Sequence, residues 1–531
     1  MQVKRALSAF VAVMLLVVGS VTAWAADKIL FIPHDNRPIS SSETAEVVQK
    51  AGYDVVMPPK DMLCGGVNQA ADTEALWQWT QKNLSGAKAA MISADSMIYG
   101  GLVPSRKHEI PLDTLLDRAE RLSKLQQANP GMKIYIFGSL MRTPRSGAYA
   151  GSEEPDYYMQ YGADIFQRSA LLDKQETTAL SKKEKKELSV REAAIPAKYL
   201  SDWQARRDKN FQVNKKLIDM TREGRLSYLV IGKDDNAPLS QTHKEARDLK
   251  KYAEGLPATR FQLLAGIDEF GLLLLTRAVN DLERVIPFVY TEYAPGKGYD
   301  TVPSFSDAKI GDSVNAAIQV AGAIPVADPA KADLVFLVST NKDGVTGDGI
   351  VIGEGVKLPS NDGRERENTK AMAQKVNDYV YRGYPLALAD ISFANGADSA
   401  LMKRLQQGNL LYRLRGYSGW NTATNSTGFA LAMGILSRHI SDDDCDRLLT
   451  RRYLEDWGYQ AIIRGKVGDT LYGFRQRDVY TNLGSREGAV TDRIQQEIRN
   501  FALYNLPPFD GLDDVQVKLP WHRMFEADFV W

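Results

Sequence analysis

The sequence has few residues of the kinds that build disulfide frameworks and common zinc sites. Among 531 residues there are two cysteines and five histidines. Cys64 and Cys445 lie far apart and form no C-x-x-C pair, so they cannot supply a four-thiolate zinc site. The histidines form no H-E-x-x-H motif, which excludes the common zinc-protease pattern. We expect two separate thiols and predict no cofactor.

Long apolar runs are also absent, except at the N-terminus. There Lys4 and Arg5 precede an apolar run from Ala6 to Val18, and Ala23-Trp24-Ala25 follows. A basic start, a short apolar run and an A-x-A site are typical of a secretory signal peptide. We therefore expect residues 1–25 to be removed and the mature chain to be periplasmic or extracellular. The alternative is an uncleaved membrane anchor.

The chain has no excess charge of either sign, because 66 Lys and Arg balance 66 Asp and Glu. A nucleic-acid-binding protein needs a basic surface for its phosphate contacts, so nucleic acid is not an expected partner. After the leader no segment reaches the roughly 18 apolar residues of a spanning helix, and no stable membrane insertion is expected. The expected partner is a small-molecule or glycan substrate. The sequence gives no oligomeric state.

Short apolar segments recur along the chain, and each is followed by a helix-like stretch. They span residues 29–33, 54–57, 89–93, 133–137, 228–231, 262–265 and 287–290. Continuous apolar runs without alternation are typical of parallel strands that are covered on both faces. The pattern predicts an α/β fold with a mostly parallel sheet or a barrel.

The predicted organisation has three parts after the leader. An α/β domain spans residues 26–297 and carries a helical insertion at about 145–225, in which Ser181 and Glu184 have the spacing of a helix capping box. A second α/β region spans 298–399, and a mainly helical region spans 400–531. The insertion follows a strand end and is a candidate lid; a plain solvated helix is the alternative.

Acidic residues stand in pairs after two predicted strands, as Asp234-Asp235 and Asp268-Glu269. In α/β folds ligands bind at the carboxyl ends of the strands. Two carboxyl groups held close together can have divergent pKa values, so that one is an acid while the other stays charged. We predict these four residues as catalytic, with one member of each pair facing the site. Helix caps or salt bridges are the alternative.

Ten further residues are predicted to bind substrate, because they lie in strand-end loops or in the glycine-bounded segment around Trp420. They are His34, Asp35, Asn36, Arg37, Asp95, Tyr99, Arg142, Asn236, Trp420 and Asn421. Arginines can bind anions or neutralise nearby aspartates. Amides suit sugar hydroxyls, and aromatic rings offer stacking surfaces. The aspartates could hold a hard cation, but no calcium-loop spacing is present and no metal site is predicted.

Several stretches resemble a known family. They are Ile32–Pro38, Tyr99–Arg106, Gly232–Pro238, Gly419–Thr422 and Leu519–Glu526. Their order over nearly all of the mature chain is similar to the bacterial family called domain of unknown function 4127. That label carries no reaction, so the resemblance implies one family-wide group of loops and no mechanism.

These features together predict an extracytoplasmic hydrolase of carbohydrate or cell-envelope glycan, similar to a glycoside hydrolase, that uses the strand-end carboxylates. One alternative is a non-catalytic periplasmic binding protein for a small polar ligand, which would close about a hinge. Another is a metal-assisted hydrolase of an anionic ester.

Overall fold

The computed structural model describes residues 26–145, 147, 153–349, 360–471, 481–507 and 511–531. The predicted signal peptide, residues 1–25, lies outside the described residues. In the part of the chain that is described, no helix has both the length and the apolar character needed to cross a membrane.

The first half of the chain forms a parallel sheet of six strands in the order β2-β1-β3-β4-β5-β6. The strands are β1 (Lys28–Ile32), β2 (Asp54–Val56), β3 (Ala89–Ser93), β4 (Lys133–Leu140), β5 (Tyr228–Lys233) and β6 (Phe261–Ala265). Their registers are parallel throughout. All six predicted strands are confirmed. The inner strands β1, β3, β4 and β5 are almost completely buried, as expected for parallel strands covered on both faces, whereas the edge strand β2 is only partly buried.

The second half forms another parallel sheet, of five strands in the order β13-β11-β9-β7-β8. The strands are β7 (Phe288–Tyr293), β8 (Ile324–Val326), β9 (Leu334–Ser339), β11 (Leu386–Asp390) and β13 (Gly416–Ser418). Both sheets are open, so the parallel-sheet form of the α/β prediction is confirmed and the barrel form is wrong for the described residues. In both, the second strand lies outside the first and the later strands follow on the other side, which is a doubly wound order.

Two predicted domain boundaries differ from the structure. Strand β7 was expected in the first domain, but it pairs with β8 and β9, so the second unit begins before Phe288 and not after Lys297. The Pro295–Gly298 stretch, which lies at the predicted boundary, is part of the segment that follows β7. The region after residue 400 is not separate either, since it supplies β13 to the second sheet.

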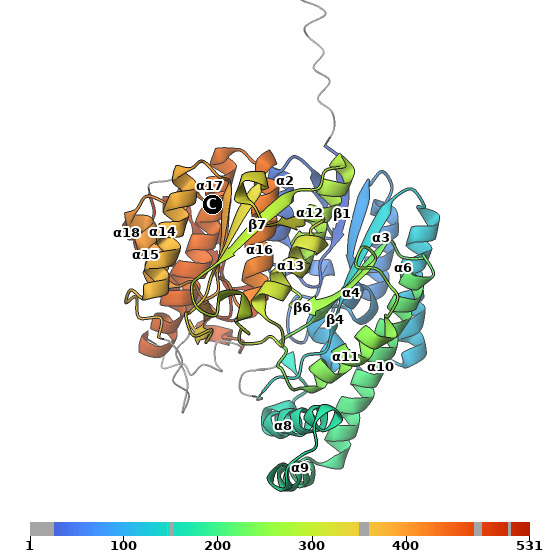
Figure 1. Cartoon of the computed structure of the whole chain (residues 1–531). Helices are drawn as coiled ribbons and strands as arrows, with labels where there is room; N and C mark the ends of the chain where they lie inside the picture. Colours follow the sequence, from blue (N-terminus) through green and yellow to red (C-terminus); the bar gives the residue numbers. More distant parts are fainter. Residues whose placement is uncertain (1–25, 146, 148–152, 350–359, 472–480, 508–510) are drawn as a thin grey trace, which may run out of the picture.

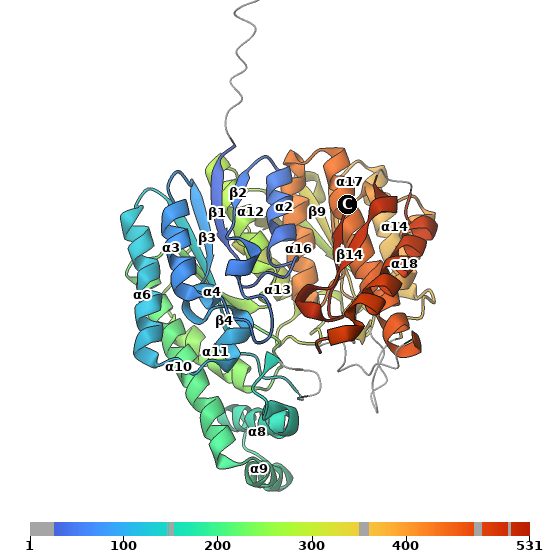
Figure 2. The same cartoon turned by 180° about the vertical axis from the view of Figure 1, so that it is seen from behind.

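Two apolar helices join the halves. Helix α12 (Phe270–Glu283) packs on α16 (Ala423–Leu436) between the two sheets (Figures 1 and 2). Every residue of α16 is buried, as expected for a helix that is apolar on all sides. One hydrophobic core therefore runs through both units and includes Phe31 of β1 and Leu337 of β9.

The remaining elements cover the two sheets. Around the first lie α2 (Ser42–Lys50), α3 (Thr73–Asn83), α4 (Ala94–Tyr99), α5 (Leu102–Lys107), α6 (Leu112–Ala128) and α11 (Gln241–Tyr252). The second half adds α13 (Ile310–Val320), α14 (Glu367–Tyr381), α15 (Ser399–Gln407), α17 (Asp442–Arg452), a π-helical segment (Tyr453–Ile463), α18 (Glu487–Asn505) and the short strands β10 (Gly347–Asp348), β12 (Phe393–Ala394), β14 (Gln516–Lys518) and β15 (Asp528–Val530).

The predicted insertion is helical and projects from one end of the first unit (Figure 1). It consists of α8 (Tyr158–Thr177), α9 (Lys182–Ala194) and α10 (Ala197–Arg222), between β4 and β5. The capping box is confirmed, with Ser181 and Glu184 bonded reciprocally at the start of α9. No residue of α9 is buried, so its Lys/Glu run is a solvated helix. Elsewhere, Cys64 and Cys445 are both buried free thiols, as predicted.

Candidate functional site

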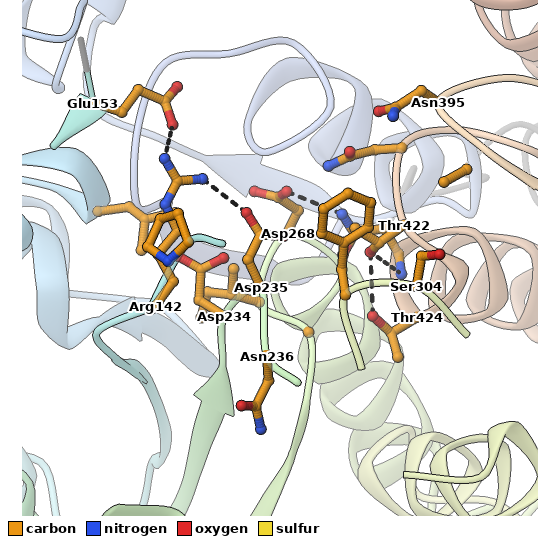
Figure 3. Close-up of a pocket in the computed structure, with 18 of the residues that line it drawn as sticks. Arg142, Glu153, Asp234, Asp235, Asn236, Asp268, Ser304, Asn395, Thr422 and Thr424 are labelled. Atoms are coloured by element: carbon orange, nitrogen blue, oxygen red, sulfur yellow. Dashed lines mark hydrogen bonds and ion pairs between the residues drawn. The ribbon is translucent and has the colours of Figure 1, made fainter. Parts of the chain in front are cut away.

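A cavity of about 300 Å³ opens where the carboxyl ends of the two sheets face each other (Figure 3). The first unit lines it with the loops after β1, β4, β5 and β6, and the second with the loops after β7, β9, β11 and β13. Of the predicted residues, the lining includes Arg37, Arg142, Asp234, Asp235, Asn236, Asp268 and Asn421. The charged and amide groups that were expected at separate strand ends therefore share one hollow.

Asp268 is held in the cavity by three side chains. Its Oδ1 accepts hydrogen bonds from Arg37 Nη2 at 2.6 Å and contacts His34 Nε2 at 3.0 Å. Its Oδ2 accepts a bond from Asn425 Nδ2 at 3.1 Å. Burial alone would raise the pKa of Asp268, but the charges of Arg37 and His34 outweigh burial and hold the pKa below its ordinary value. Asp268 therefore stays ionised near neutral pH.

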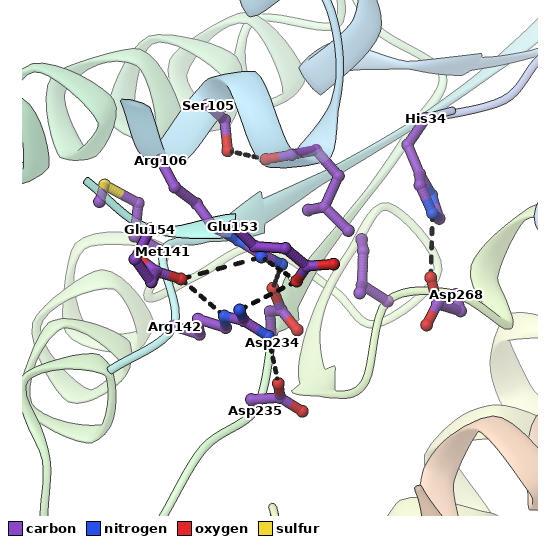
Figure 4. Close-up of polar contacts among 12 residues, drawn as sticks. His34, Ser105, Arg106, Met141, Arg142, Glu153, Glu154, Asp234, Asp235 and Asp268 are labelled. Atoms are coloured by element: carbon purple, nitrogen blue, oxygen red, sulfur yellow. Dashed lines mark hydrogen bonds and ion pairs between the residues drawn. The ribbon is translucent and has the colours of Figure 1, made fainter. Parts of the chain in front are cut away.

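Asp234 and Asp235 each pair with a buried arginine (Figure 4). Asp234 is bonded to Arg106, and Asp235 Oδ2 accepts a bond from Arg142 Nη1 at 2.7 Å. The prediction that one member of this pair would face the site is wrong. Asp235 has a left-handed φ of 33°, so the chain is not extended there and both side chains line the cavity.

Asp235 differs from its neighbours in exposure and in protonation. Its side chain is 26% exposed, against 9% for Asp234 and 7% for Asp268. Burial of its carboxyl, and next the charge of Asp234, raise the pKa of Asp235 to about 6. Two carboxyl groups of one cavity, Asp235 and Asp268, thus have pKa values displaced in opposite directions.

Glu269 lies behind the cavity, as expected for the second member of its pair. Its Oε2 accepts the backbone N–H of Ile267 at 3.0 Å, and the carboxyl packs against the Cα of Gly266, where an added Cβ would lie 1.9 Å from Glu269 Oε1. Burial raises the pKa of Glu269 well above its ordinary value. The structure gives Glu269 no contact with the hollow and does not support its predicted catalytic role.

The loop after β1 supports the cavity mainly from behind. Asp35 Oδ2 accepts a bond from Arg37 Nε at 2.9 Å, and Asp35 Oδ1 accepts the backbone N–H of Arg37 at 3.0 Å. Asp35 and His34 thus hold the guanidinium that touches Asp268. Asn36 turns elsewhere, donating to the carbonyl of Lys60 at 3.1 Å and accepting from Trp521 Nε1 at 2.9 Å.

Three other predicted binding residues are buried away from the lining. Tyr99 stacks on His108 with ring centres 5.0 Å apart, and Trp420 packs against Phe525 with ring centres 6.2 Å apart. The stacking surfaces that these two rings were predicted to offer a sugar are already covered. Asp95 is buried beneath the cavity, where burial raises the pKa of its carboxyl to about 6. Asn236 lines the cavity but is turned away from Asp234 in Figure 3.

The second unit supplies a wall that is mostly uncharged. Asn395 and Asn421 both have left-handed backbone conformations, with φ of 59° and 52°, and the N–H of Asn395 donates to the carbonyl of Asn421 at 2.7 Å. Thr422 caps α16 by accepting the N–H of Asn425 at 3.5 Å. Asn425 Oδ1 is buried with no hydrogen-bond partner in the described structure. Non-glycine residues in the left-handed region often mark binding sites.

The match to a family model spans residues 29–530, and its description reads protein of unknown function (DUF4127). The chain belongs to the DUF4127 family. No curated protein and no solved structure matches this DUF4127 chain.

Sequence reasoning missed residues of this DUF4127 protein that join the arginines of the cavity. Glu153 accepts bonds from Arg106 at 3.1 Å, Arg142 at 2.9 Å and Arg523 at 2.7 Å. Burial alone would raise the pKa of Glu153, but the charges of Arg523 and Arg142 lower it below its ordinary value. Glu153 lies between β4 and α8 but not directly after the end of the strand at Leu140, so a search of the residues next to the strand ends could not find it. The only signal for Arg523 was the Leu519–Glu526 stretch shared with the DUF4127 family.

A metal is not needed to neutralise the carboxylates of the DUF4127 cavity. Arginines pair with Asp234, Asp235 and Asp268 at ion-pair distance. Within the residues that the structure describes, no three His, Cys, Asp or Glu side chains are grouped so as to hold a metal ion.

Proposed function

We propose that the cavity is the active site of an extracytoplasmic hydrolase that acts on carbohydrate, with cell-envelope glycan as the expected class. The observation that carries the proposal is the contrast between Asp235 and Asp268, whose pKa values are displaced in opposite directions on one cavity. Hydrolysis of a glycosidic bond uses one carboxyl group that donates a proton and another that stays charged. The export part rests on the signal-peptide pattern of residues 1–25.

Asp235 is the proposed proton donor. Its side chain is more exposed than those of Asp234 and Asp268, and Arg142 fixes its Oδ2 at 2.7 Å. With a pKa of about 6, a substantial fraction is protonated in mildly acidic to neutral solution, which suits a general acid. The proton goes to the oxygen of the leaving sugar as its bond to the anomeric carbon breaks. A water then adds its hydroxyl to that carbon and returns its other proton to the Asp235 carboxylate.

Asp268 is the proposed charged partner. Its negative charge is kept by Arg37 and His34, and its position is fixed by Asn425 at 3.1 Å. A fixed carboxylate favours the positive charge that develops on a sugar ring as the glycosidic bond breaks. The group is held before substrate arrives, so little reorganisation is needed.

The opposite wall is suited to hydroxyl groups. Asn395, Asn421, Thr422 and Thr424 line it, and their amide and hydroxyl groups can both donate and accept. Phe525 adds apolar ring atoms to the same lining, with the guanidinium carbon of Arg523 5.0 Å from its ring centre. A polar wall that is mostly uncharged, with Asp348 as its one lining carboxylate among the described residues, suits the hydroxyl groups of a sugar ring.

The rival receptor function has less support. A binding protein that closes by a hinge needs an interface that can open between its halves. Here α12 and α16 join the halves through one continuous core. The metal-assisted alternative lacks support too, because Asp234, Asp235 and Asp268 already have arginine partners.

The test is hydrolysis by purified protein that begins at residue 26, with cell-envelope glycans and chromogenic glycosides, with and without chelator. Asp235→Asn is compared with Asp164→Asn, a matched control on the insertion. Asp164 is 23% exposed and bonds Arg191 at 2.7 Å, much as Asp235 bonds Arg142. We expect Asp235→Asn to lower kcat by about 10²–10⁴-fold and the control to leave it unchanged.

Three results would count against this assignment. A folded Asp235→Asn variant that hydrolyses glycans as fast as the wild type would remove the proposed acid. Stabilisation of the wild type by sugars without any cleavage would favour the receptor, and loss of cleavage with chelator would favour the metal-assisted reaction.

A further inference from the structure

The cavity contains four arginines, and three of them are already neutralised. Arg37 pairs with Asp35 and Asp268, Arg106 with Asp234 and Glu153. Arg142 pairs with Asp235, Glu153 and Glu154. These guanidiniums shape the charged wall, but their carboxylate partners leave them little capacity for an anionic ligand.

Arg145 is different from the other three. It lines the cavity, it is exposed, and within the described part of the chain it forms no ion pair with a carboxylate. Its guanidinium carbon lies 5.8 Å from the ring centre of Phe166, on α8. A guanidinium placed over an aromatic face is held in orientation while its N–H edge remains available.

The backbone that leads to Arg145 is anchored by buried groups. Arg207 of α10 donates to the carbonyls of Met141 at 2.8 Å and Arg142 at 2.9 Å. The hydroxyl of Tyr158 donates to the carbonyl of Pro144, the residue before Arg145, at 2.9 Å. The insertion therefore fixes the position from which Arg145 reaches the cavity, as expected for a binding residue on a supported loop.

We propose that the substrate is an anionic carbohydrate and that Arg145 binds its oxyanion, a carboxylate, phosphate or sulfate group. This inference rests on the proposed function and names the substrate class for the same cavity. The planar guanidinium recognises such oxyanions through two parallel hydrogen bonds. On the opposite wall the buried, unpartnered Oδ1 of Asn425 accepts a hydroxyl hydrogen. A sugar that has both hydroxyl groups and an oxyanion satisfies the two walls together.

The test measures binding by calorimetry with the Asp235→Asn variant, so that no ligand is consumed. The probes are a uronic acid, a sugar phosphate and a sugar sulfate, each compared with its neutral parent sugar. We expect at least one anionic sugar to bind about 10-fold or more tightly than its parent, and Arg145→Gln to abolish that preference while leaving the neutral sugar unchanged. Higher salt should weaken only the anionic ligand.

Lys198→Gln is the matched control, because Lys198 is an exposed cation 4.6 Å from the ring centre of Tyr199 but does not line the cavity. It should leave the preference intact, and Arg145→Lys should retain part of it. Equal binding of anionic and neutral sugars, or an unchanged preference in Arg145→Gln, overturns the inference.

The two proposals can fail separately. If an anionic sugar binds through Arg145 but no glycan is hydrolysed, the substrate-class inference stands as a ligand assignment and the hydrolase proposal fails. If neutral and anionic glycans are cleaved equally well, with dependence on Asp235 but not on Arg145, the hydrolase proposal stands and the inference fails.

Discussion

The opposite pKa displacements of Asp235 and Asp268 predict opposite effects of pH on stability, and these need no substrate to measure. The perturbation is Asp235→Asn, which replaces the carboxyl by a neutral group of similar shape. The pKa of Asp235 rises from about 3.8 to about 6 on folding. Between about pH 4 and pH 6 the unfolded chain loses this proton while the folded protein keeps it, so wild-type stability falls as pH rises.

The size of this effect follows from the shift. A displacement of roughly two units at about 1.4 kcal/mol each gives up to about 3 kcal/mol. The penalty is absent below about pH 4, grows to about pH 6 and is complete above it. Asp235→Asn has no titrating proton at this position and does not suffer the penalty. The free energy of unfolding of the variant minus that of the wild type should therefore increase by up to about 3 kcal/mol between pH 4 and pH 7.5.

The assay is urea unfolding of both proteins at several pH values in this window. Asp268→Asn is the control with the opposite sign, because the pKa of Asp268 is lowered by Arg37 and His34. Its stabilising contribution is present above the ordinary pKa of about 4 and is lost as pH falls through the folded-state value. At neutral pH, replacement of the Asp268 carboxylate by the amide should lower the free energy of unfolding by about 3–5 kcal/mol. A relative stability of Asp235→Asn that does not change with pH would refute the reasoning.

Three further outcomes follow from the packing. Gly428→Ala places a Cβ 2.5 Å from Glu269 Cγ, so it should lower the free energy of unfolding, measured by thermal unfolding, by about 1–3 kcal/mol. The control Gly488→Ala meets no atom within 4 Å and should leave the stability unchanged or slightly raise it. Because burial raises the pKa of Glu269 above its ordinary value of 4.5, the free energy of unfolding of Glu269→Gln relative to wild type should increase as pH rises above about 4.5; a difference that does not change with pH would mean that the pKa is not raised. Mass spectrometry after alkylation should find both Cys64 and Cys445 modified in denaturant and neither in the native protein, because both are buried free thiols.

The strands were predictable because their signal is local. Residues 29–33 and 89–93 are continuous apolar runs, and a buried parallel strand needs nothing more from the sequence. The assignment of β7 to a sheet was not predictable in the same way. Its apolar run at 287–290 looks like the six runs before it. Only its pairing with β8 and β9, which lie further along the chain, places it in the second unit.

The site could be predicted only in part, for a similar reason. The expectation that ligands bind at the carboxyl ends of the strands identified Asp234, Asp235 and Asp268, all of which line the cavity. It could not show that Asp235 takes a left-handed conformation, which turns both members of the pair inward. It could not find Glu153 either, whose three arginine partners include Arg523, 370 residues away in sequence.

The shared core explains why a cavity between two α/β units can act as a preformed site. Each unit ends its strands at the same hollow, and α12 and α16 fix the angle between the units by packing on each other. Glu269, at the start of α12, contacts the Cα of Gly428 in α16, so the residue directly after Asp268 lies in the seam between the halves. The position of the charged carboxylate relative to the amide wall is therefore set by core packing. A protein built in this way needs no closing motion to bring Asp268 and Asn425 together, since they are already hydrogen-bonded across the seam.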